Sequence, residues 1–363
     1  MQRLKKRHKQ KWKWEWSKLK VAVIGGTGYG GVELIRLLAH HPHAELSAVL
    51  SHTQSGKDLV EVYPHLTGIV EQTVHALDVE QLAETHDLVF LATPSGVSKD
   101  ILPQLVEKGI RCIDLAGDFR LKDPQLYPQW YHHEPASDAY LQKAVYGLSE
   151  IYREEIAQAQ FIANPGCYPT AALLGLIPIL KAGWIDPHTV IIDAKSGVSG
   201  AGRKQSLATH FSETNENLKV YKLGVHQHIP EIEQILSNVG QQEVKITFAT
   251  HLVPMTRGIM CTMYVQLNEG KTTKEIIDLY HSFYERDAFV RIRPEGVWPA
   301  TKEVYGSNYC DIGLAHDQRT GRLVIVSVID NLVKGAAGQA IQNMNIMNNW
   351  DETTGLNVLP VYP

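Results

Sequence analysis

The chain has 363 residues, of which 44% are hydrophobic and 20% are charged. This length allows a large buried core and about two domains, and the composition excludes a disordered or fibrous protein. The formal net charge of -4 gives no electrostatic reason to expect nucleic acid as the main partner, so small molecules are expected. No run approaches the roughly 20 apolar residues needed to cross a bilayer.

The four cysteines are widely spaced, and none of them belongs to a CxxC pair. This spacing argues against a zinc site or a redox dithiol and favours a reducing cytoplasm. The N-terminus is strongly basic, with interleaved Trp12, Trp14 and Trp16. Because it lacks the apolar stretch of a secretion signal, we expect residues 1–18 to be a disordered extension. A tail that binds nucleic acid or a membrane surface is the alternative.

The first half of the chain alternates β-branched runs with helical patterns, which is typical of a parallel sheet covered by helices. The sequence predicts strands over 20–24, 45–50, 87–92 and 111–115, and helices over 31–40 and 97–108. This order indicates an α/β, Rossmann-type nucleotide-binding domain, which we place at residues 19–165.

The second half has fewer helices between its strand-like segments, which indicates a mixed or antiparallel sheet. The sequence predicts strands over 189–194, 243–250, 258–266 and 323–329, and helices over 170–180 and 272–285. We therefore expect an α+β catalytic and dimerisation domain at residues 166–330. A helical stretch rich in Gly and Ala follows at 332–345, and residues 331–363 are expected to pack back on the first domain.

A glycine-rich turn, GGTGYGG, follows the first predicted strand directly and opens a helix. Gly28 lets the backbone approach a pyrophosphate, and the helix N-terminus favours its negative charge. The run satisfies both GxGxxG and GxxGxxG, and the sequence does not choose between them. An ordinary glycine turn without a ligand is the alternative, against which the flanking strand and helix argue. The residues of this turn expected to bind the cofactor are Gly25, Thr27, Gly28, Tyr29, Gly30 and Gly31.

The end of the second predicted strand carries no acidic residue before Asp58. An acidic residue there would hold the ribose 2′-hydroxyl of NAD and would repel the 2′-phosphate of NADP. Ser51, Thr53 and Lys57 can hold a 2′-phosphate instead. The sequence therefore predicts NADP as the cofactor.

Cys167 lies in the segment NPGCYPT, between an apolar run and a long apolar helix. Pro169 suits a first helical turn, because its missing N–H would be unpaired there anyway. A helix N-terminus stabilises a thiolate, so we expect a lowered thiol pKa and a nucleophile at neutral pH. Cys112, Cys261 and Cys310 lie within apolar runs and are expected to be buried small hydrophobes.

A cysteine nucleophile needs a partner that moves protons. Among 17 histidines, His226 and His228 are the best candidates, because Gly224 and Pro230 around them indicate an irregular loop. One of the two is expected to take protons and the other to be structural. A metal site that uses both is disfavoured, since no third ligand stands nearby at a recognised spacing.

An anionic substrate calls for arginines, whose forked guanidinium suits carboxylates and phosphates. Arg120 follows the last strand of the first half, Arg203 lies in the loop SGVSGAGR, and Arg257 precedes a strand. A surface ion pair is the alternative for each of them.

Together these segments resemble the N-acetyl-γ-glutamyl-phosphate reductase family, whose relatives are the aspartate-semialdehyde and glyceraldehyde-3-phosphate dehydrogenases. The resemblance runs from Leu19 to the C-terminus. It is carried by KVAVIGGTGYGGVELIRLL, LATP, DLAGDFRL, YGLSE, ANPGCYPTA, SGVSGAGR, HQHIPEIEQ and DNLVKGAAGQAIQNMN. The cysteine and histidine segments are specific to the family, whereas the glycine segment is shared with many nucleotide binders.

The resemblance implies the NADPH-dependent reduction of N-acetyl-γ-glutamyl phosphate to the 5-semialdehyde, with release of phosphate, in arginine biosynthesis. It implies Cys167 as the nucleophile and His226 as the acid/base, with Arg120 at the substrate phosphate and Arg257 as a further substrate contact. Gln227 stands where the family often has a basic residue, which leaves the local substrate contacts open. The resemblance also implies cofactor contacts from Thr93, Pro94, Ser196, Gly197 and Asn331.

A cytoplasmic homodimer or homotetramer is expected from the same resemblance. Within enzymes, the alternative is a related reductase that acts on aspartyl or α-aminoadipyl phosphate. Outside enzymes, the alternative is a NADP-binding regulatory protein, which would have no use for a cysteine at the start of a helix.

Overall fold

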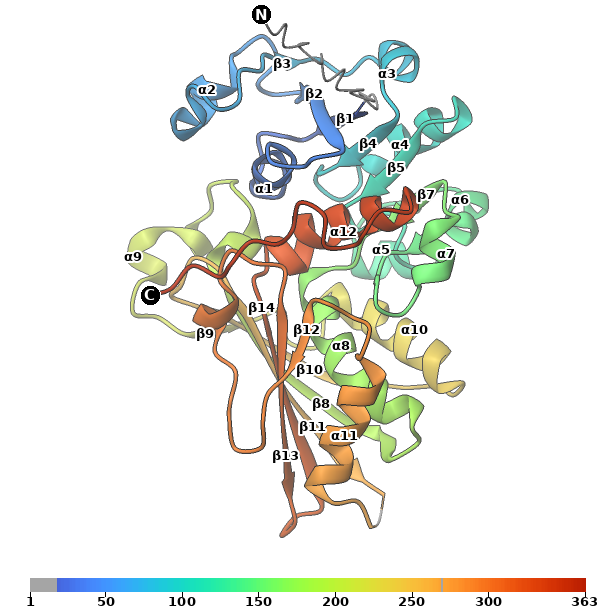
Figure 1. Cartoon of the computed structure of the whole chain (residues 1–363), viewed down its shortest axis with the longest axis vertical. Helices are drawn as coiled ribbons and strands as arrows, with labels where there is room; N and C mark the ends of the chain where they lie inside the picture. The colour runs from blue at the N-terminus through green and yellow to red at the C-terminus, as the bar shows by residue number, and fades with distance from the viewer. Residues whose placement is uncertain (1–17, 269) are drawn as a thin grey trace, which may run out of the picture.

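The computed structural model describes residues 18–268 and 270–363. Over these residues the chain forms two seven-stranded sheets, which lie one beyond the other along the long axis of the molecule (Figure 1). The basic extension predicted at the N-terminus lies outside the described residues, apart from Lys18. Among the described residues, no helix combines the length and the apolar character that a membrane span requires.

The first sheet is parallel throughout, with the strand order β3-β2-β1-β4-β5-β7-β6. Its strands are β1 (Leu19–Ile24), β2 (Ala44–Leu50), β3 (Val74–His75), β4 (Leu88–Leu91), β5 (Arg111–Asp114), β6 (Val145–Tyr146) and β7 (Phe161–Ala163). The chain runs outward from β1 to β3 and returns to β4 on the other side of β1. The turn after β1 therefore lies where the strand order reverses, the place where such sheets bind ligands. The predicted Rossmann-type sheet is confirmed.

Seven helices belong to this half of the described chain. They are α1 (Tyr29–Leu38), α2 (Leu59–Val62), α3 (Val79–Thr85), α4 (Ser98–Glu107), α5 (Leu126–Trp130), α6 (Asp138–Lys143) and α7 (Arg153–Ala157). The two helices predicted from the sequence correspond to α1 and α4. The others escaped prediction because they are too short for a helical period of apolar residues to stand out.

The second sheet is mixed, as predicted, with the order β12-β13-β14-β11-β8-β10-β9. Its strands are β8 (Ile185–Gly197), β9 (Lys219–Tyr221), β10 (Thr247–Val253), β11 (Ile259–Leu267), β12 (Val290–Ile292), β13 (Cys310–Asp317) and β14 (Arg322–Ile329). Only β8 with β10 and β12 with β13 are parallel among the described pairs. The strand predicted at 243–250 begins later, at Thr247.

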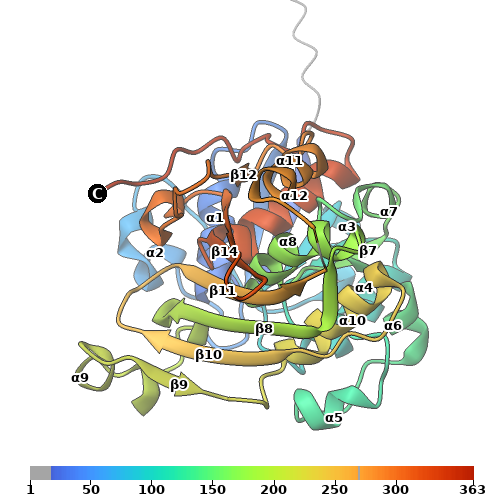
Figure 2. The same cartoon turned by 90° about the horizontal axis from the view of Figure 1, so that it is seen from below.

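Along β11 buried and half-buried side chains alternate, so one face of the second sheet is covered and the other is not. The covered face packs against α8 (Cys167–Lys181) (Figure 2), and α11 (Thr273–Phe283) packs beside α8. The remaining helices of this half are α9 (Phe211–Thr214) and α10 (His228–Gly240), and α10 packs against α8. Short 3-10 turns lie at Pro64–Leu66, Val198–Ala201, Leu207–Thr209 and Thr301–Val304.

The chain returns to the first sheet through a π-helical turn, η5 (Val333–Ala337), and α12 (Gly338–Met347). Ala340, Ile341 and Met344 of α12 belong to the same buried core as Val21 and Leu34 of the first half. Through these contacts the C-terminal segment packs on the first half of the chain, and Figure 1 shows α12 lying between the two sheets.

The glycine turn is crowded on one side and open on the other. Gly25 has a φ of +83°, and a Cβ built on Gly31 would lie 2.3 Å from the carbonyl oxygen of Gly25. By contrast, a Cβ on Gly28 would meet its nearest neighbour at 3.5 Å, and one on Gly30 would meet nothing within 4 Å. Gly25 and Gly31 therefore serve the backbone packing of the turn, whereas Gly28 and Gly30 leave room above it.

Replacing Gly31 by alanine tests this crowding. In Gly31→Ala the methyl group meets backbone that cannot rotate away, so the free energy of unfolding should fall by about 1–3 kcal/mol. Gly30→Ala, in the same helical turn, should change it by less than about 1 kcal/mol, in the stabilising direction. Urea denaturation without cofactor measures both, and equal losses in the two variants would contradict the packing described.

Ion pairs join α1 to the second sheet. Glu33 of α1 is 2% exposed, and its two oxygens accept hydrogen bonds from Arg36 at 2.6 Å and from Arg257 at 2.8 Å. Arg257, which precedes β11, also lies 3.5 Å from a carboxylate oxygen of Asp330. Burial acts to raise the pKa of Glu33, but the hydrogen bonds and charges of the two arginines outweigh it, and the pKa lies below its usual value.

Arg257→Met leaves the buried Glu33 with Arg36 alone, so it should lower the free energy of unfolding at pH 7 by up to about 3–5 kcal/mol. Because the folded-state pKa of Glu33 is depressed, the stabilisation exists above the unfolded-state pKa and disappears as the pH falls through the folded-state value. The difference between parent and variant should therefore shrink in strongly acidic buffer, as denaturation at several pH values would measure. Unchanged stability together with a raised substrate KM would instead make Arg257 a substrate-binding residue.

Candidate active site

Cys167 is the first residue of α8 and is half-buried. Gly166 before it has an extended backbone, and its carbonyl accepts the N–H of Thr170 at 2.9 Å, which closes the first turn. The helix begins three residues earlier than the sequence predicts, with Pro169 inside its first turn, where a missing N–H costs nothing. The sulfur thus lies at the positive end of the helix dipole.

Burial nevertheless raises the pKa of the Cys167 thiol to about 11. The charge of Arg120 and the backbone N–H of Tyr168 act in the opposite direction but do not outweigh burial. The expected lowering of this pKa by the helix dipole is therefore wrong for the protein without substrate. Cys167 thus rests as a thiol, and a nucleophilic role would require a neighbour that accepts its proton.

Both histidines of the HQH segment lie beside the turn that carries Cys167. A Cβ built on Gly166 would lie 2.4 Å from Nε2 of His228, and the ring centroids of His226 and His228 are 4.7 Å apart. The predicted irregular loop is wrong from His228 onward, because α10 begins there. Pro230 falls in the first turn of α10, where proline is tolerated, so it does not mark the end of an element.

Both histidines are neutral near pH 7. Burial, with a contribution from the charge of Lys222, lowers the pKa of His226 to about 3, and burial also holds the pKa of His228 well below its usual value. Nδ1 of His226 accepts the backbone N–H of His228 at 3.1 Å, so the proton of its ring belongs on Nε2. Nδ1 of His228 is buried and has no partner among the described residues. The resemblance implies His226 as the acid/base, and the structure places the ring of His228 next to Gly166 as a second candidate.

Arg120 is buried and binds the backbone directly after β5 and directly after β7. Its Nε donates to the carbonyl of Asn164 and its Nη2 to the carbonyl of Leu115, both at 2.8 Å. Nη1 lies 3.5 Å from a carboxylate oxygen of Glu231. The hydroxyl of Tyr131, whose pKa Arg120 influences, is buried without a hydrogen-bond partner in the described part of the chain. The contact of Arg120 with a substrate phosphate stays a prediction.

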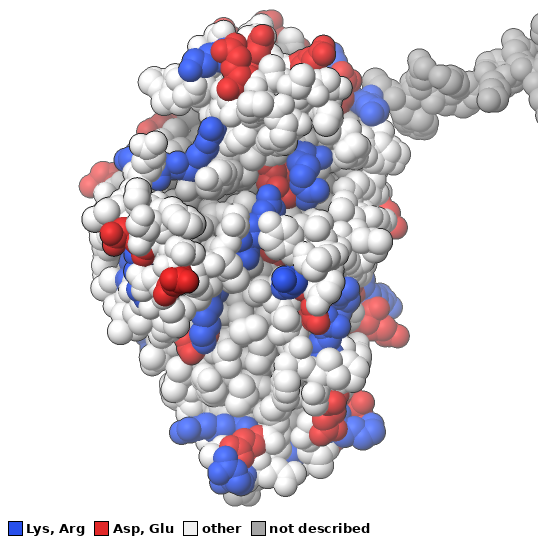
Figure 3. Space-filling view, turned by 90° about the vertical axis from the view of Figure 1, so that its left-hand side faces the viewer, with Lys and Arg blue, Asp and Glu red and all other residues white. Residues whose placement is uncertain are grey.

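The other two arginines lie elsewhere. Arg257 is engaged with Glu33 and Asp330, so its substrate contact also stays a prediction. Arg203 donates to the carbonyl of Thr27 at 3.2 Å and lies 4.5 Å above the ring of Tyr63, next to the glycine turn. Figure 3 shows Lys and Arg side chains in a hollow between the two halves of the molecule, a setting that suits an anionic ligand.

Most of the residues predicted to bind the cofactor lie at the carboxyl ends of β1, β2 and β4. The hydroxyl of Thr27 donates to that of the buried Ser51 at 3.1 Å, whereas Thr53 and Lys57 are exposed on the loop that follows. Thr93 carries a buried hydroxyl without a partner among the described residues. Together with the open side of the glycine turn, these groups fit the phosphates and ribose of a dinucleotide. Tyr29 is half-buried and Pro94 is exposed.

Ser196, Gly197 and Asn331 form a second cluster. Oδ1 of Asn331 accepts the N–H of Gly258 at 2.8 Å, and its Nδ2 donates to the hydroxyl of Ser199 at 3.0 Å. Ser196 donates to the carbonyl of Gly197 at 3.0 Å. These bonds shape the loop after β8, and the expected cofactor contacts of the three residues stay predictions.

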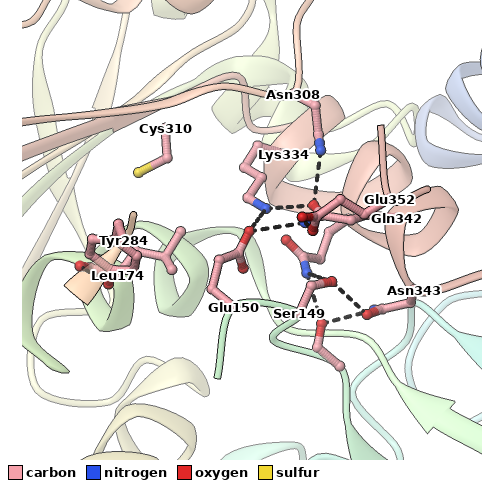
Figure 4. Close-up of polar contacts among 12 residues, drawn as sticks. Ser149, Glu150, Leu174, Tyr284, Asn308, Cys310, Lys334, Gln342, Asn343 and Glu352 are labelled. Carbon is pink, nitrogen blue, oxygen red and sulfur yellow. Dashed lines mark hydrogen bonds and ion pairs between the residues drawn. The ribbon is translucent and has the colours of Figure 1, made fainter. Parts of the chain in front are cut away.

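The C-terminal segment supports the cysteine turn from behind. A Cβ on Gly335 of η5 would lie 2.9 Å from the Cβ of Cys167, and Asn164 accepts from Asn343 of α12 at 3.0 Å. Figure 4 shows Ser149 donating to Asn343 at 2.8 Å, and beside it a fully buried ion pair at 2.5 Å. That pair is Lys334 with Glu150. These residues belong to the segments YGLSE and DNLVKGAAGQAIQNMN, but no spacing in the sequence reveals that the two segments are in contact.

Two family models match the chain. Semialdehyde dehydrogenase, NAD binding domain, matches residues 20–159, and semialdehyde dehydrogenase, dimerisation domain, matches residues 167–331. Among solved structures, aspartate semialdehyde dehydrogenase II from Vibrio cholerae is 17% identical with a TM-score of 0.71, over 92% of this chain and 99% of that one. Aspartate semialdehyde dehydrogenase with NADP from Candida albicans has a TM-score of 0.67 at 17% identity, over 92% and 99%. These two structures show the fold.

Curated relatives are much more similar. The N-acetyl-gamma-glutamyl-phosphate reductase of Geobacillus sp. (strain WCH70) is 57% identical over 345 residues, which cover 95% of this chain and 100% of the relative. The protein of the same name from Bacillus subtilis (strain 168) is 53% identical over the same shares. The chain therefore belongs to the N-acetyl-gamma-glutamyl-phosphate reductase family of the semialdehyde dehydrogenases.

Proposed function

We propose that this chain catalyses the NADPH-dependent reduction of N-acetyl-γ-glutamyl phosphate to N-acetylglutamate 5-semialdehyde and phosphate, in arginine biosynthesis. The observation that carries the proposal is the half-buried Cys167 at the start of α8, with two neutral histidines beside its turn. The names of the relatives supply the substrate. A binding protein without catalysis would have no need of this arrangement.

The first chemical step is acyl transfer to sulfur. Cys167 loses its proton and attacks the carbonyl carbon of the acyl phosphate, the bond to the phosphate oxygen breaks, and a thioester remains. The ring of His228, next to Gly166, offers a place for the thiol proton, and the Nε2–H of His226 can donate to the carbonyl oxygen as it gains charge. The charge of Arg120 favours both the thiolate and the departing phosphate.

The second step returns the sulfur to its starting state. Bound NADPH supplies the hydride that reduces the thioester carbon. His226 then accepts the proton of the former carbonyl oxygen as the carbon–oxygen double bond forms again. The electrons of the carbon–sulfur bond return to Cys167, which takes back the proton that His228 accepted in the first step, and the aldehyde leaves.

The choice of NADP is supported by the loop after β2. Ser51, Thr53 and Lys57 follow β2 and could bind a 2′-phosphate, and no carboxylate precedes Asp58 there. The glycine turn and the residues after β4 would hold the rest of the dinucleotide, with Ser196, Gly197 and Asn331 toward the nicotinamide.

We infer a homodimer or homotetramer for the assembled enzyme. The matched dimerisation-domain family model supports it, as does the uncovered face of the second sheet, on which Ile191 is 43% exposed. A cytoplasmic location is supported by four cysteines that form no disulfide.

The reverse reaction tests substrate, cofactor and nucleophile together. With N-acetylglutamate 5-semialdehyde and phosphate, the parent protein should reduce NADP well and NAD poorly, and Cys167→Ser should bind NADPH yet turn over at least about 10³-fold more slowly. Cys112→Ala, which alters a buried cysteine of β5 in the first sheet, is the matched control and should remain active. Faster turnover with aspartate semialdehyde, or normal turnover by Cys167→Ser, would overturn the proposal.

The resting state of the thiol can be measured by alkylation. Because burial raises the pKa of Cys167 to about 11, the thiolate fraction is small at pH 7 and rises with pH up to that value. The rate of inactivation by iodoacetamide, without substrate, should therefore still be increasing at pH 9–10. For an ordinary thiol, whose pKa is about 8.5, the rate would already be levelling off there. A plateau below pH 8 would show that the thiolate exists before substrate binds.

A further inference from the structure

A buried carboxylate lies directly beneath the cysteine turn. Glu231 is 0% exposed, and its Oε1 accepts the N–H of Gly166 at 2.8 Å and the hydroxyl of Tyr146 at 2.7 Å. Its Oε2 lies 3.5 Å from Nη1 of Arg120. One side chain thus touches the start of α8, strand β6 and the arginine that follows β5.

Glu231 and His228 come from the same turn of α10, three residues apart, and residues so spaced lie on one face of a helix. Both meet Gly166, the carboxylate at its N–H and the ring of His228 at the position that a Cβ would occupy. The first turn of α10 therefore contacts Gly166, the residue directly before Cys167, on two sides.

The charge of Glu231 does not serve to activate the sulfur. After burial, its negative charge is one of the causes that raise the pKa of Cys167, and it partly cancels the help that Arg120 gives. A buried carboxylate is also costly to desolvate and is weak evidence of a gain in stability. Glu231 can therefore support the reaction only by fixing the position of the cysteine turn.

We propose that Glu231 is a positioning residue of the reaction: by holding the N–H of Gly166, it fixes Cys167 against the ring of His228 and the guanidinium of Arg120. This inference rests on the proposed function, in which Cys167 attacks the acyl phosphate. Nothing in it requires Glu231 to touch substrate or cofactor, and its complete burial keeps it from both.

Two conservative variants separate geometry from charge. Glu231→Gln keeps the length of the side chain, so that its amide oxygen still accepts from Gly166, but it removes the charge. Glu231→Asp keeps the charge, but its side chain is one methylene shorter, so that it loses the hydrogen bond from the N–H of Gly166. If position matters, Glu231→Asp should lower kcat by about 10- to 100-fold with the KM for NADPH unchanged, because displacements near 1 Å have effects of that size. Glu231→Gln should retain more of kcat than Glu231→Asp.

Alkylation of Cys167 by iodoacetamide, measured against pH without substrate, gives a second readout. Glu231→Gln removes a negative charge near the sulfur, so the midpoint should move to lower pH while turnover falls below the parent's. Glu231→Asp should keep the midpoint near that of the parent. Glu233→Gln, two residues along α10 and paired with Lys245 at the surface, is the matched control and should leave both readouts unchanged.

The outcomes distinguish the positioning role of Glu231 from the proposed function of the chain. Full kcat in Glu231→Asp, or a greater loss in Glu231→Gln than in Glu231→Asp, would overturn the positioning role even if Cys167→Ser is inactive. Normal turnover by Cys167→Ser would overturn the proposed function itself. A loss of thermal stability in the Glu231 variants with unchanged kcat and an unmoved alkylation midpoint would assign Glu231 a role in folding only.

Discussion

The structure depends on one tight turn, in which β7 ends and α8 begins within four residues. The turn must bring a sulfur to the edge of the first sheet while its own backbone polar groups stay buried, and buried polar groups need partners. The partners come from every neighbouring element. Asn164 is held by the end of β5, by Arg120 and by Asn343, and Gly166 is held by Glu231. The active-site geometry follows from satisfying these groups.

Burial and the helix dipole compete for the state of Cys167, and burial prevails. The dipole of α8 and the charge of Arg120 favour a thiolate, but the half-buried position opposes any isolated charge. The same burial keeps His226 and His228 neutral, because it disfavours their protonated forms as well. A cysteine that rests as a thiol is also less susceptible to oxidation than a thiolate.

Much of this arrangement could be read from the sequence. The parallel sheet, the mixed sheet, the returning C-terminal helix and a helix that starts close to Cys167 all follow from periodicity and from the placement of Gly and Pro. Two local expectations were wrong because a tertiary or positional effect prevailed. Pro230 was interpreted as a loop residue although it lies in the first turn of α10, and the thiol pKa was expected from the dipole alone, without the burial that outweighs it. Glu231, Glu150 and Lys334 could not be found at all, because only folding brings them to the cysteine turn or to each other.

The packing of Gly335 and Asn343 behind the cysteine turn has a consequence for synthesis of the chain. Cys167 is made long before the segment 331–347, yet that segment supplies the surface on which its turn rests. A nascent chain that already contains the whole first sheet and α8 therefore still lacks one wall of its active site. The contacts behind Cys167 are completed only when translation has passed α12 and that helix has docked.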